Sequence, residues 1–413
     1  MFEPALYKGM KYMRFKPDNL LIVGTDVANL ASSTNRAGYN VFSVDFFGDL
    51  DLRKACFESL SIAEQVQGKV FPRFDDNYDP MALVSLAEEL TSREKIDGIL
   101  LSSGLEDFPD LLTELAEQAP IIGNSPETIN GVRDRSLFFR ELKRLGVHFP
   151  ITEFASDLIE AKNKARDIGY PVVLKPSVGF GGVGIRVVRS KNRVEDAFKQ
   201  VSRHSEKILI QELIIGEHAS SSVISTKNEA KALTVNEQIL GSTELGQFEP
   251  FGYCGNLVPI STLDSIECCR SVAEKVVSHF GLVGSNGVDF VISEDTPFVI
   301  EVNPRFQGTL ECVERVLDIN LVETHINACL EDVIPQSLET VCFCTRLILF
   351  APFRCVIPDL ISLEFLRDIP LPNIIIQKGE PVCSVVSDDK NGETCLSKAF
   401  SMAGEVKRKL IKT

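Results

Sequence analysis

Short apolar runs alternate with amphipathic stretches through the first third of the chain. The runs at 19–26, 39–45 and 96–101 predict buried strands, 69–72 predicts one more short strand, and the stretches at 27–37, 81–91 and 108–118 predict helices. Strands that alternate with helices favour a parallel sheet joined by helical crossovers. The sequence therefore predicts an α/β domain at the start of the chain.

Polar residues stand at the carboxyl ends of these predicted strands, where parallel sheets bind their ligands. They are Asp45, Ser102, Ser103, Gly104 and Glu106. Substrate binding is one role for them, and an ordinary surface loop explains them equally well. The first strand–helix turn has one glycine, at position 24, whereas a dinucleotide fingerprint needs three, so the pattern excludes a nicotinamide-binding domain.

A helix and a glycine-rich turn follow. The helix is predicted to begin after a cap at Ser125 and to run through 134–135 to 145. The turn lies between predicted strands at 170–176 and 185–188 and holds Gly179, Gly181, Gly182 and Gly184. Because glycine has no Cβ, the N–H groups of such a flap can approach phosphate oxygens closely. Lys175, at the end of the first strand, needs a partner if it is buried, and a nucleotide phosphate would supply it.

The second half of the chain predicts a β-hairpin with acidic residues. The apolar runs 288–292 and 297–300 flank a polar turn at 293–296. Residues i and i+2 of a strand share a face, so Glu301 and Asn303 point together, and Asp289 can lie across the hairpin from them. Carboxylate and amide oxygens suit Mg²⁺ with substrate phosphates, whereas a solvated strand end is the plainer interpretation.

Other segments are predicted to form secondary structure, with fewer candidate functional residues. A strand at 207–212 leads into 213–218, the stretches 237–240 and 246–259 are expected to line a substrate cleft, and 263–280 has the period of an amphipathic helix. In the tail, 345–352 and 380–386 predict strands, and 397–412 predicts a helix whose basic end suits its C-terminus.

Composition narrows the classes of partner. A net charge of −15 argues against nucleic-acid and anionic-membrane partners, which bind basic patches. No apolar run is long enough to span a bilayer, and the first 16 residues have no secretory leader. Eleven scattered cysteines and five histidines lack zinc spacing and indicate buried thiols in a reducing cytosol, so a cytoplasmic location is expected.

Three features of the chain resemble, in their order, the ATP-grasp superfamily over about residues 20–335. They are the flap with its lysine, the strand that leads into 213–218, and the acid followed by Glu301-Val302-Asn303-Pro304-Arg305. The resemblance implies a mixed α/β and α+β architecture. A Rossmann-like pre-ATP-grasp domain (1–125) would precede a small lobe with a glycine-rich lid (126–210), a large lobe with a magnesium-nucleotide site (211–335) and a small β-rich C-terminal domain (336–413) similar to that of biotin carboxylase.

The resemblance also implies roles for single residues. The cofactors would be ATP and Mg²⁺, with Mn²⁺ as an alternative, and Asp289, Glu301 and Asn303 would hold the metal. Arg305 would contact the transferred phosphoryl group or acyl phosphate. Lys175 and the lid glycines Gly179, Gly181 and Gly182 would bind phosphates. Glu212 would accept from the adenine amino group, the backbone of Leu213 and Ile214 would pair with the ring edge, and Glu217 or His218 would hold the ribose. The family usually shows Asp-Lys where this chain has Asp134-Arg135, so Arg135 takes the place of a phosphate-binding lysine.

The implied reaction joins a small-molecule carboxylate to an amine through an acyl phosphate, releasing ADP and phosphate. A bicarbonate-using carboxylase or carbamoyl-phosphate-type enzyme is one alternative, and a non-catalytic ATP-binding subunit is another. The resemblance also implies a homodimer as an assembly to test. The sequence does not name the acid or the amine.

Overall fold

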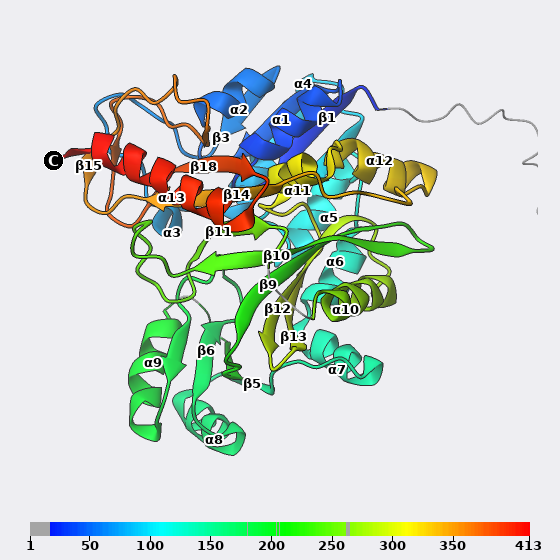
Figure 1. Cartoon of the computed structure of the whole chain (residues 1–413), viewed down its shortest axis with the longest axis vertical. Helices are drawn as coiled ribbons and strands as arrows, with labels where there is room; N and C mark the ends of the chain where they lie inside the picture. The colour runs from blue at the N-terminus through cyan, green and yellow to red at the C-terminus, as the bar shows by residue number, and fades with distance from the viewer. Residues whose placement is uncertain (1–16, 180, 204, 206, 262–264) are drawn as a thin grey trace, which may run out of the picture.

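The computed structural model describes residues 17–179, 181–203, 205, 207–261 and 265–413, and its strands form four sheets (Figure 1). The first 16 residues, on which the expectation about a leader falls, and the first residues of the helix predicted at 263–280 lie outside this range. A parallel sheet opens the chain, two antiparallel sheets follow, and the tail adds a small third one. The predicted mixed α/β architecture is confirmed.

The N-terminal sheet has the strand order β3-β2-β1-β4 and is parallel throughout. Its region contains β1 (Asn19–Val23), α1 (Ala28–Arg36), β2 (Asn40–Asp45), α2 (Leu50–Ala55), β3 (Glu58–Ser61), α3 (Phe74–Asn77), α4 (Pro80–Arg93), β4 (Gly98–Leu101) and α5 (Pro109–Gln118). The third strand is 58–61, which the sequence analysis missed because its side chains are mostly polar and half-buried. The strand predicted at 69–72 is wrong, since the described residues there make one isolated bridge, from Val70 to Ile375.

The next region holds a four-stranded antiparallel sheet with the order β5-β8-β6-β7. Its elements are α6 (Pro126–Arg133), α7 (Arg135–Leu145), β5 (Thr152–Ala155), α8 (Leu158–Ile168), β6 (Val172–Pro176), β7 (Arg186–Val188), the 3₁₀ turn η1 (Lys191–Arg193), α9 (Val194–Val201) and β8 (Ile208–Glu212). The single helix predicted over 126–145 is wrong: Asp134 adopts an extended backbone and accepts the N–H groups of Ser136 and Leu137, so α6 ends there and α7 begins.

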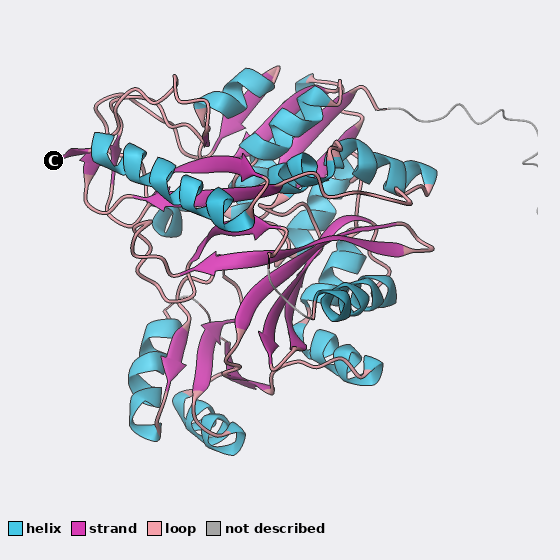
Figure 2. Ribbon diagram, in the orientation of Figure 1, coloured by secondary structure: helices cyan, strands magenta, loops and turns pink. Residues whose placement is uncertain are grey.

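An eight-stranded sheet forms the centre of the molecule, with the order β13-β12-β9-β10-β11-β14-β18-β16 (Figure 2). Its first part contains β9 (Glu217–Ser225), β10 (Ala230–Leu240), β11 (Tyr253–Val258), α10 (Ile266–His279), β12 (Gly284–Ser293), β13 (Thr296–Asn303), α11 (Leu310–Leu317) and α12 (Leu321–Glu331). The tail supplies β14 (Phe343–Phe350), β15 (Cys355–Val356), β16 (Leu366–Arg367), β17 (Ile375–Ile376), β18 (Pro381–Asp389), α13 (Gly392–Lys409) and β19 (Ile411–Lys412). Strands on both sides of residue 336 thus share one sheet.

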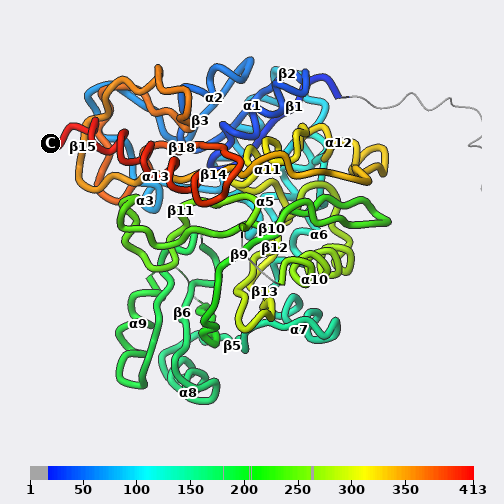
Figure 3. Tube along the Cα trace, viewed as in Figure 1, coloured from blue at the N-terminus to red at the C-terminus, as the bar shows by residue number. Residues whose placement is uncertain are grey.

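The tail also packs along the N-terminal region, as the tube in Figure 3 shows for the segments near α2 and β15. The N–H groups of Asp368 and Ile369 donate to the Asp51 carboxylate at 2.9 and 2.8 Å. Buried residues of both segments, such as Phe46 and Ile374, share one apolar core. These contacts make the two ends of the chain one wall of the site. No helix among the described residues combines the length and apolar composition that a bilayer crossing requires.

Candidate active site

The hairpin of β12 and β13 places three oxygen-bearing side chains together. Asp289 is paired directly with Glu301, and Asn303 lies two residues further on the same face. The Asn303 amide donates to Asp289 Oδ2 at 3.0 Å, and the Gln238 amide on β10 donates to Asp289 Oδ1 at 3.0 Å. The predicted convergence of positions 289, 301 and 303 is therefore present in the structure.

Three cations surround the Glu301 carboxylate. Arg135 Nη2 lies 3.1 Å and Arg133 Nη1 lies 3.8 Å from Glu301 Oε2, and Lys175 contributes a third positive charge. Burial raises the pKa of Glu301, but Arg135 and the other two cations outweigh it and hold this pKa at about 2. Burial and then the charge of Arg135 lower the pKa of Lys175 to about 8. Three cations thus converge on Glu301, although Asp107 pairs with one of them, Arg133, and such a group of cations suits a triphosphate.

The donor set fits a magnesium ion that is shared with phosphates. Two carboxylates and an amide oxygen are hard ligands, and Mg²⁺ commonly takes one or two carboxylates together with substrate phosphates and water. Burial and then the charge of Glu301 raise the pKa of Asp289 to about 7, so an added cation here would relieve a real repulsion. The described residues contain no group of three His, Cys, Asp or Glu side chains arranged for a metal, so phosphate oxygens would have to complete the coordination.

The glycine-rich turn lies closed over this end. Gly181 accepts a hydrogen bond from the N–H of Tyr253 at 2.8 Å, and a Cβ on Gly182 would meet the carbonyl oxygen of Phe251 at 1.9 Å. Arg186, at the base of the turn, forms an ion pair with Glu249 at 2.5 Å. Gly179, Gly181 and Gly182 all line the cavity beneath. Glycine at 182 is thus required by both a φ of +73° and close contact.

The segment after β8 forms another wall of the cavity. Glu212, Leu213, Ile214 and His218 line it, whereas Glu217 is exposed and is not among its lining residues. Glu212 Oε2 accepts the N–H of Ile151 at 3.1 Å, so part of its carboxylate is already engaged. Burial lowers the pKa of His218, which keeps its ring neutral at physiological pH. Of the two ribose candidates, the structure brings His218 into the site.

Arg305 connects the hairpin to the N-terminal region. Its Nε donates to Glu106 Oε1 at 2.7 Å, and its Nη2 donates to Asn303 Oδ1 at 3.3 Å. Ser102, Ser103 and Glu106 line the cavity. This position fits the substrate-binding role that was one of two interpretations of the polar residues at the strand ends. Asp45 and Gly104 are not lining residues. The Asp45 carboxylate instead accepts from the N–H groups of Phe47 and Gly48 and from Ser61, which makes it a loop-fixing group.

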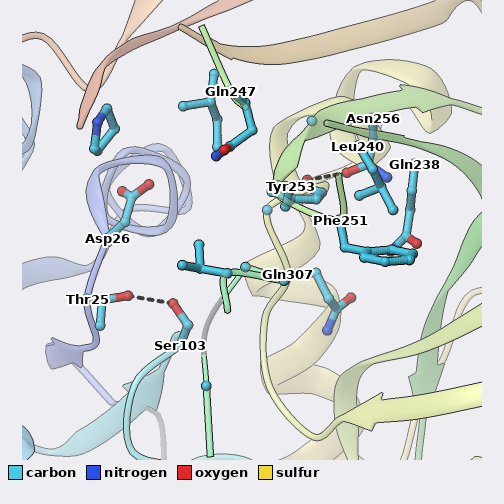
Figure 4. A pocket seen from close by; sticks show the side chains of 18 of the residues that line it. Thr25, Asp26, Ser103, Gln238, Leu240, Gln247, Phe251, Tyr253, Asn256 and Gln307 are labelled. Carbon is cyan, nitrogen blue, oxygen red and sulfur yellow. Dashed lines mark hydrogen bonds between the residues drawn. The ribbon is translucent and has the colours of Figure 1, made fainter. Parts of the chain in front are cut away.

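The cavity of about 820 Å³ extends well beyond the hairpin. Figure 4 shows Thr25, Asp26 and Ser103 on one side and Gln238, Tyr253 and Asn256 on the other. Sequence analysis missed Arg133, whose guanidinium lines the cavity and donates to both oxygens of Asp107 at 2.6 and 2.7 Å. Arg135 contacts Glu301 but is not itself a lining residue. The Arg-Asp-Arg spacing was the available signal, because the helix break at 134 directs both arginines to one carboxylate.

A row of polar side chains crosses the cavity face of the large sheet. Gln238, which contacts Asp289, is paired with Asn256 on β11, and Asn256 is paired with Arg346 on β14. The Tyr253 hydroxyl donates to Asn256. Burial raises the pKa of Tyr253, and the guanidinium groups of Arg346 and Arg305 partly oppose this rise. The row joins the hairpin to Arg346, whose role the sequence did not suggest.

Comparisons with known proteins concern the family and the fold. The family model of the ATP-grasp domain matches residues 132–309. An uncharacterized protein of Methanocaldococcus jannaschii is 26% identical over 94% of this chain and 93% of its own length. The C-terminal section of the carbamoyl phosphate synthase large chain of Methanopyrus kandleri is 28% identical over 63% of this chain, which spans about half, 49%, of that section.

The fold resembles that of biotin carboxylase from Campylobacter jejuni, solved as a β-γ-ATP complex. The TM-score is 0.73 at 18% identity, and the match covers 96% of this chain and 93% of that one. The matched segment 132–309 contains the glycine-rich turn, the strand that bears Lys175 and the β12–β13 hairpin described above. The protein is therefore identified as one that carries an ATP-grasp domain, placed between a parallel N-terminal sheet and a tail that extends its central sheet.

Proposed function

We propose that the protein is an ATP-dependent ligase that joins a carboxylate to an amine through an acyl phosphate. The convergence of Asp289, Glu301 and Asn303 beneath a closed glycine turn, with three cations beside them, is the observation that supports this function most directly. Such a group neutralises a triphosphate and positions its terminal phosphoryl group, which is most of what phosphoryl transfer requires of a protein.

In this proposal the two lobes divide the work. Asp289, Glu301 and Asn303 would hold Mg²⁺, which when bound supplies charge neutralisation at the phosphates. Lys175 and Arg133 would bind phosphate oxygens, and the backbone at 213–214 would bind the adenine edge. The closed lid would keep water away from the acyl phosphate. The regions 1–125 and 336–413 would enclose the acid and the amine, while 126–210 and 211–335 would hold the nucleotide.

The proposed chemistry has two balanced steps. A carboxylate oxygen of the acid attacks the γ-phosphorus of ATP, the bond from that phosphorus to the bridging oxygen breaks, and ADP leaves. The neutral amine nitrogen then attacks the acyl carbon, loses a proton to a base, and the carbon–oxygen bond to phosphate breaks. Arg305, which donates to Glu106, would stabilise charge that develops on the transferred group.

A bicarbonate-dependent carboxylase is the second candidate. The fold likeness to biotin carboxylase extends over 96% of this chain and includes the tail strands, which favours it. In that case bicarbonate would replace the acid and the acyl phosphate would be carboxyphosphate.

A Mg²⁺-dependent assay of ADP formation against pools of acids and amines separates these functions. ADP formed only when an acid and an amine are both present supports the ligase. ADP formed with bicarbonate and no other acid supports the carboxylase. Tight ATP binding without turnover in any pool would contradict both and leave a nucleotide-binding subunit.

A further inference from the structure

The end of the cavity away from the lid is built by two segments that are far apart in sequence. Asp26 follows β1, Asp49 precedes α2, and Asp368 follows β16. Arg346 on β14 lies among them and is only 6% exposed. Its Nη2 lies 2.5 Å from Asp368 Oδ2 and 3.6 Å from Asp26 Oδ2. All four residues line the cavity.

Carboxyl groups outnumber guanidinium groups around Arg346. Asp26 and Asp368 share its one guanidinium, so Arg346 alone does not neutralise both when both are ionised. Asp49 adds a further carboxylate, whose Oδ1 accepts the Gln65 amide at 3.0 Å. Asp368 Oδ1 is enclosed and accepts no hydrogen bond from the described residues. Buried acceptors are rarely left without a donor, so this oxygen points to a donor that a ligand would supply.

Electrostatics support the same conclusion. Burial and then the charge of Asp368 raise the pKa of Asp26 to about 7. The same two causes, in the same order, raise the pKa of Asp49 well above its usual range. A bound cation would relieve both effects, whereas a carboxylate or phosphate would increase them.

Aromatic side chains form the adjoining wall. Phe47, Phe71 and Phe74 line the cavity. The Phe47 ring stacks on Phe74 at 6.0 Å and on Phe71 at 6.2 Å between centroids. The stacked rings form an apolar surface, so the wall suits packing against the hydrocarbon body of a ligand.

We propose that this end of the cavity binds the protonated amino group of the amine substrate, with Asp26 and Asp368 accepting its N–H groups and the phenylalanine wall packing against its hydrocarbon part. This inference rests on the proposed ligase function, because it names the class of its second substrate: a primary amine that arrives as a cation and carries an aliphatic or aromatic body. The ammonium group would give one proton to a subsite carboxylate such as Asp26 before the neutral nitrogen attacks. The carboxylates of the subsite disfavour anionic nucleophiles.

Calorimetric titration of the full chain with three compounds of similar shape tests the subsite. Benzylamine is the cation, benzyl alcohol the neutral counterpart and phenylacetate the anion. We expect benzylamine to bind at least roughly tenfold more tightly than benzyl alcohol, the scale of a charge-assisted hydrogen bond, and phenylacetate to bind most weakly. Equal binding of the alcohol, or tighter binding of phenylacetate, would overturn the proposal.

Isosteric variants locate the effect. Asp26→Asn, and Asp368→Asn as a second variant in case the first does not fold, should reduce benzylamine binding to the level of benzyl alcohol. Asp110→Asn, an exposed carboxylate on α5, is the matched control and should bind benzylamine as the parent chain does. Undiminished benzylamine binding in folded Asp26→Asn and Asp368→Asn chains would refute the subsite.

A separate readout distinguishes this inference from the ligase function. The rise in melting temperature with Mg²⁺ and ATP depends on the hairpin end, so it should persist in Asp26→Asn. If Mg²⁺ and ATP do not raise the melting temperature of the parent chain but benzylamine still binds, the result would contradict the ligase and support the amine subsite. The reverse pattern, an ATP effect without selective benzylamine binding, would overturn the subsite and spare the ligase.

Discussion

The two ends of the cavity arrange their charges in opposite ways. At the hairpin end, Arg133, Arg135 and Lys175 surround the Glu301 carboxylate. At the far end, acidic side chains surround the single guanidinium of Arg346. Glu301 lies among cations, and its pKa is lowered to about 2. Asp26 lies among other carboxyl groups, and its pKa is raised to about 7.

This difference shows how one cavity can hold two ligands of opposite charge. Like charges crowded in a buried place are costly, because each charge loses water and repels its neighbours. A ligand of the opposite sign would relieve that cost. We therefore propose a metal triphosphate at the hairpin end and a cation at the far end.

The strongest way to break the comparison is Glu301→Gln. It keeps the shape but removes the charge on which three cations converge, and it removes a proposed metal ligand. We expect turnover to fall by roughly 10²-fold or more, the scale of one lost transition-state contact, with folding intact. ADP formation on the active pool measures the loss. Glu294→Gln, at the exposed turn of the same hairpin, is the control, and parental turnover in Glu301→Gln would reject the site.

The next effect concerns nucleotide binding. Lys175→Ala removes a cation whose lowered pKa already reflects crowding by other positive groups. A ligand at a hundred times its Kd stabilises a fold by about 2.7 kcal/mol, so a saturating nucleotide should raise the melting temperature measurably. We expect most of that rise to disappear in Lys175→Ala and to remain in Lys207→Ala, an exposed lysine of the same lobe. Equal rises in both variants would remove Lys175 from the phosphate site.

A matched pair of glycine variants isolates the lid. Gly182→Ala would place a Cβ at 1.9 Å from the Phe251 carbonyl oxygen, whereas Gly181→Ala meets nothing within 4 Å and bears only the strain of its φ of +54°. That strain costs about 1–2 kcal/mol in each variant. We therefore expect turnover to fall by roughly tenfold more in Gly182→Ala than in Gly181→Ala, which a difference of 1.4 kcal/mol would produce. Equal losses would show that lid docking does not limit the reaction.

The smallest expected effect is on stability at the far end. The pKa of Asp26 is about 7 in the folded chain and near 3.8 when unfolded, so the folded state loses stability as pH rises from about 4 to 7. Asp26→Asn removes this cost, and Arg346 keeps Asp368 as its partner. The Asp26 side chain is 39% exposed, which weakens the effect, so we expect a gain on the order of 1 °C at pH 8 that vanishes near pH 4. A variant less stable at pH 8 would show that the carboxylate is a net stabiliser.

Local signals predicted much of the fold and of the hairpin end. The strand alternation, the cap at Ser125, the glycine turn and the register of Asp289 with Glu301 follow from residues close in sequence. The break at Asp134 was missed because amphipathic character continues through it, while its side chain caps the next helix. The strand at 58–61 was missed because it has no apolar alternation.

The far end could not be predicted from sequence, for a physical reason. Asp26, Arg346 and Asp368 come together only because the tail packs against the N-terminal region, through contacts such as Asp51 with the backbone at 368–369. The residues next to Arg346 in the sequence do not indicate a site, because Arg346 is a single charged residue in an apolar strand. Long-range packing brings the charged residues together at the far end, whereas residues close in sequence form the group at the hairpin.

The continuous eight-stranded sheet has a consequence for how such a protein could change its substrate. The lid and Lys175 belong to a separate four-stranded sheet, while Asp289 and Arg346 are fixed on the large one. Rearrangement of the loops that the tail contributes would leave the proposed phosphate site in place. If the proposed function holds, new amine preferences could be engineered, or acquired in evolution, by exchanging the residues around 368–383 without rebuilding the β12–β13 hairpin.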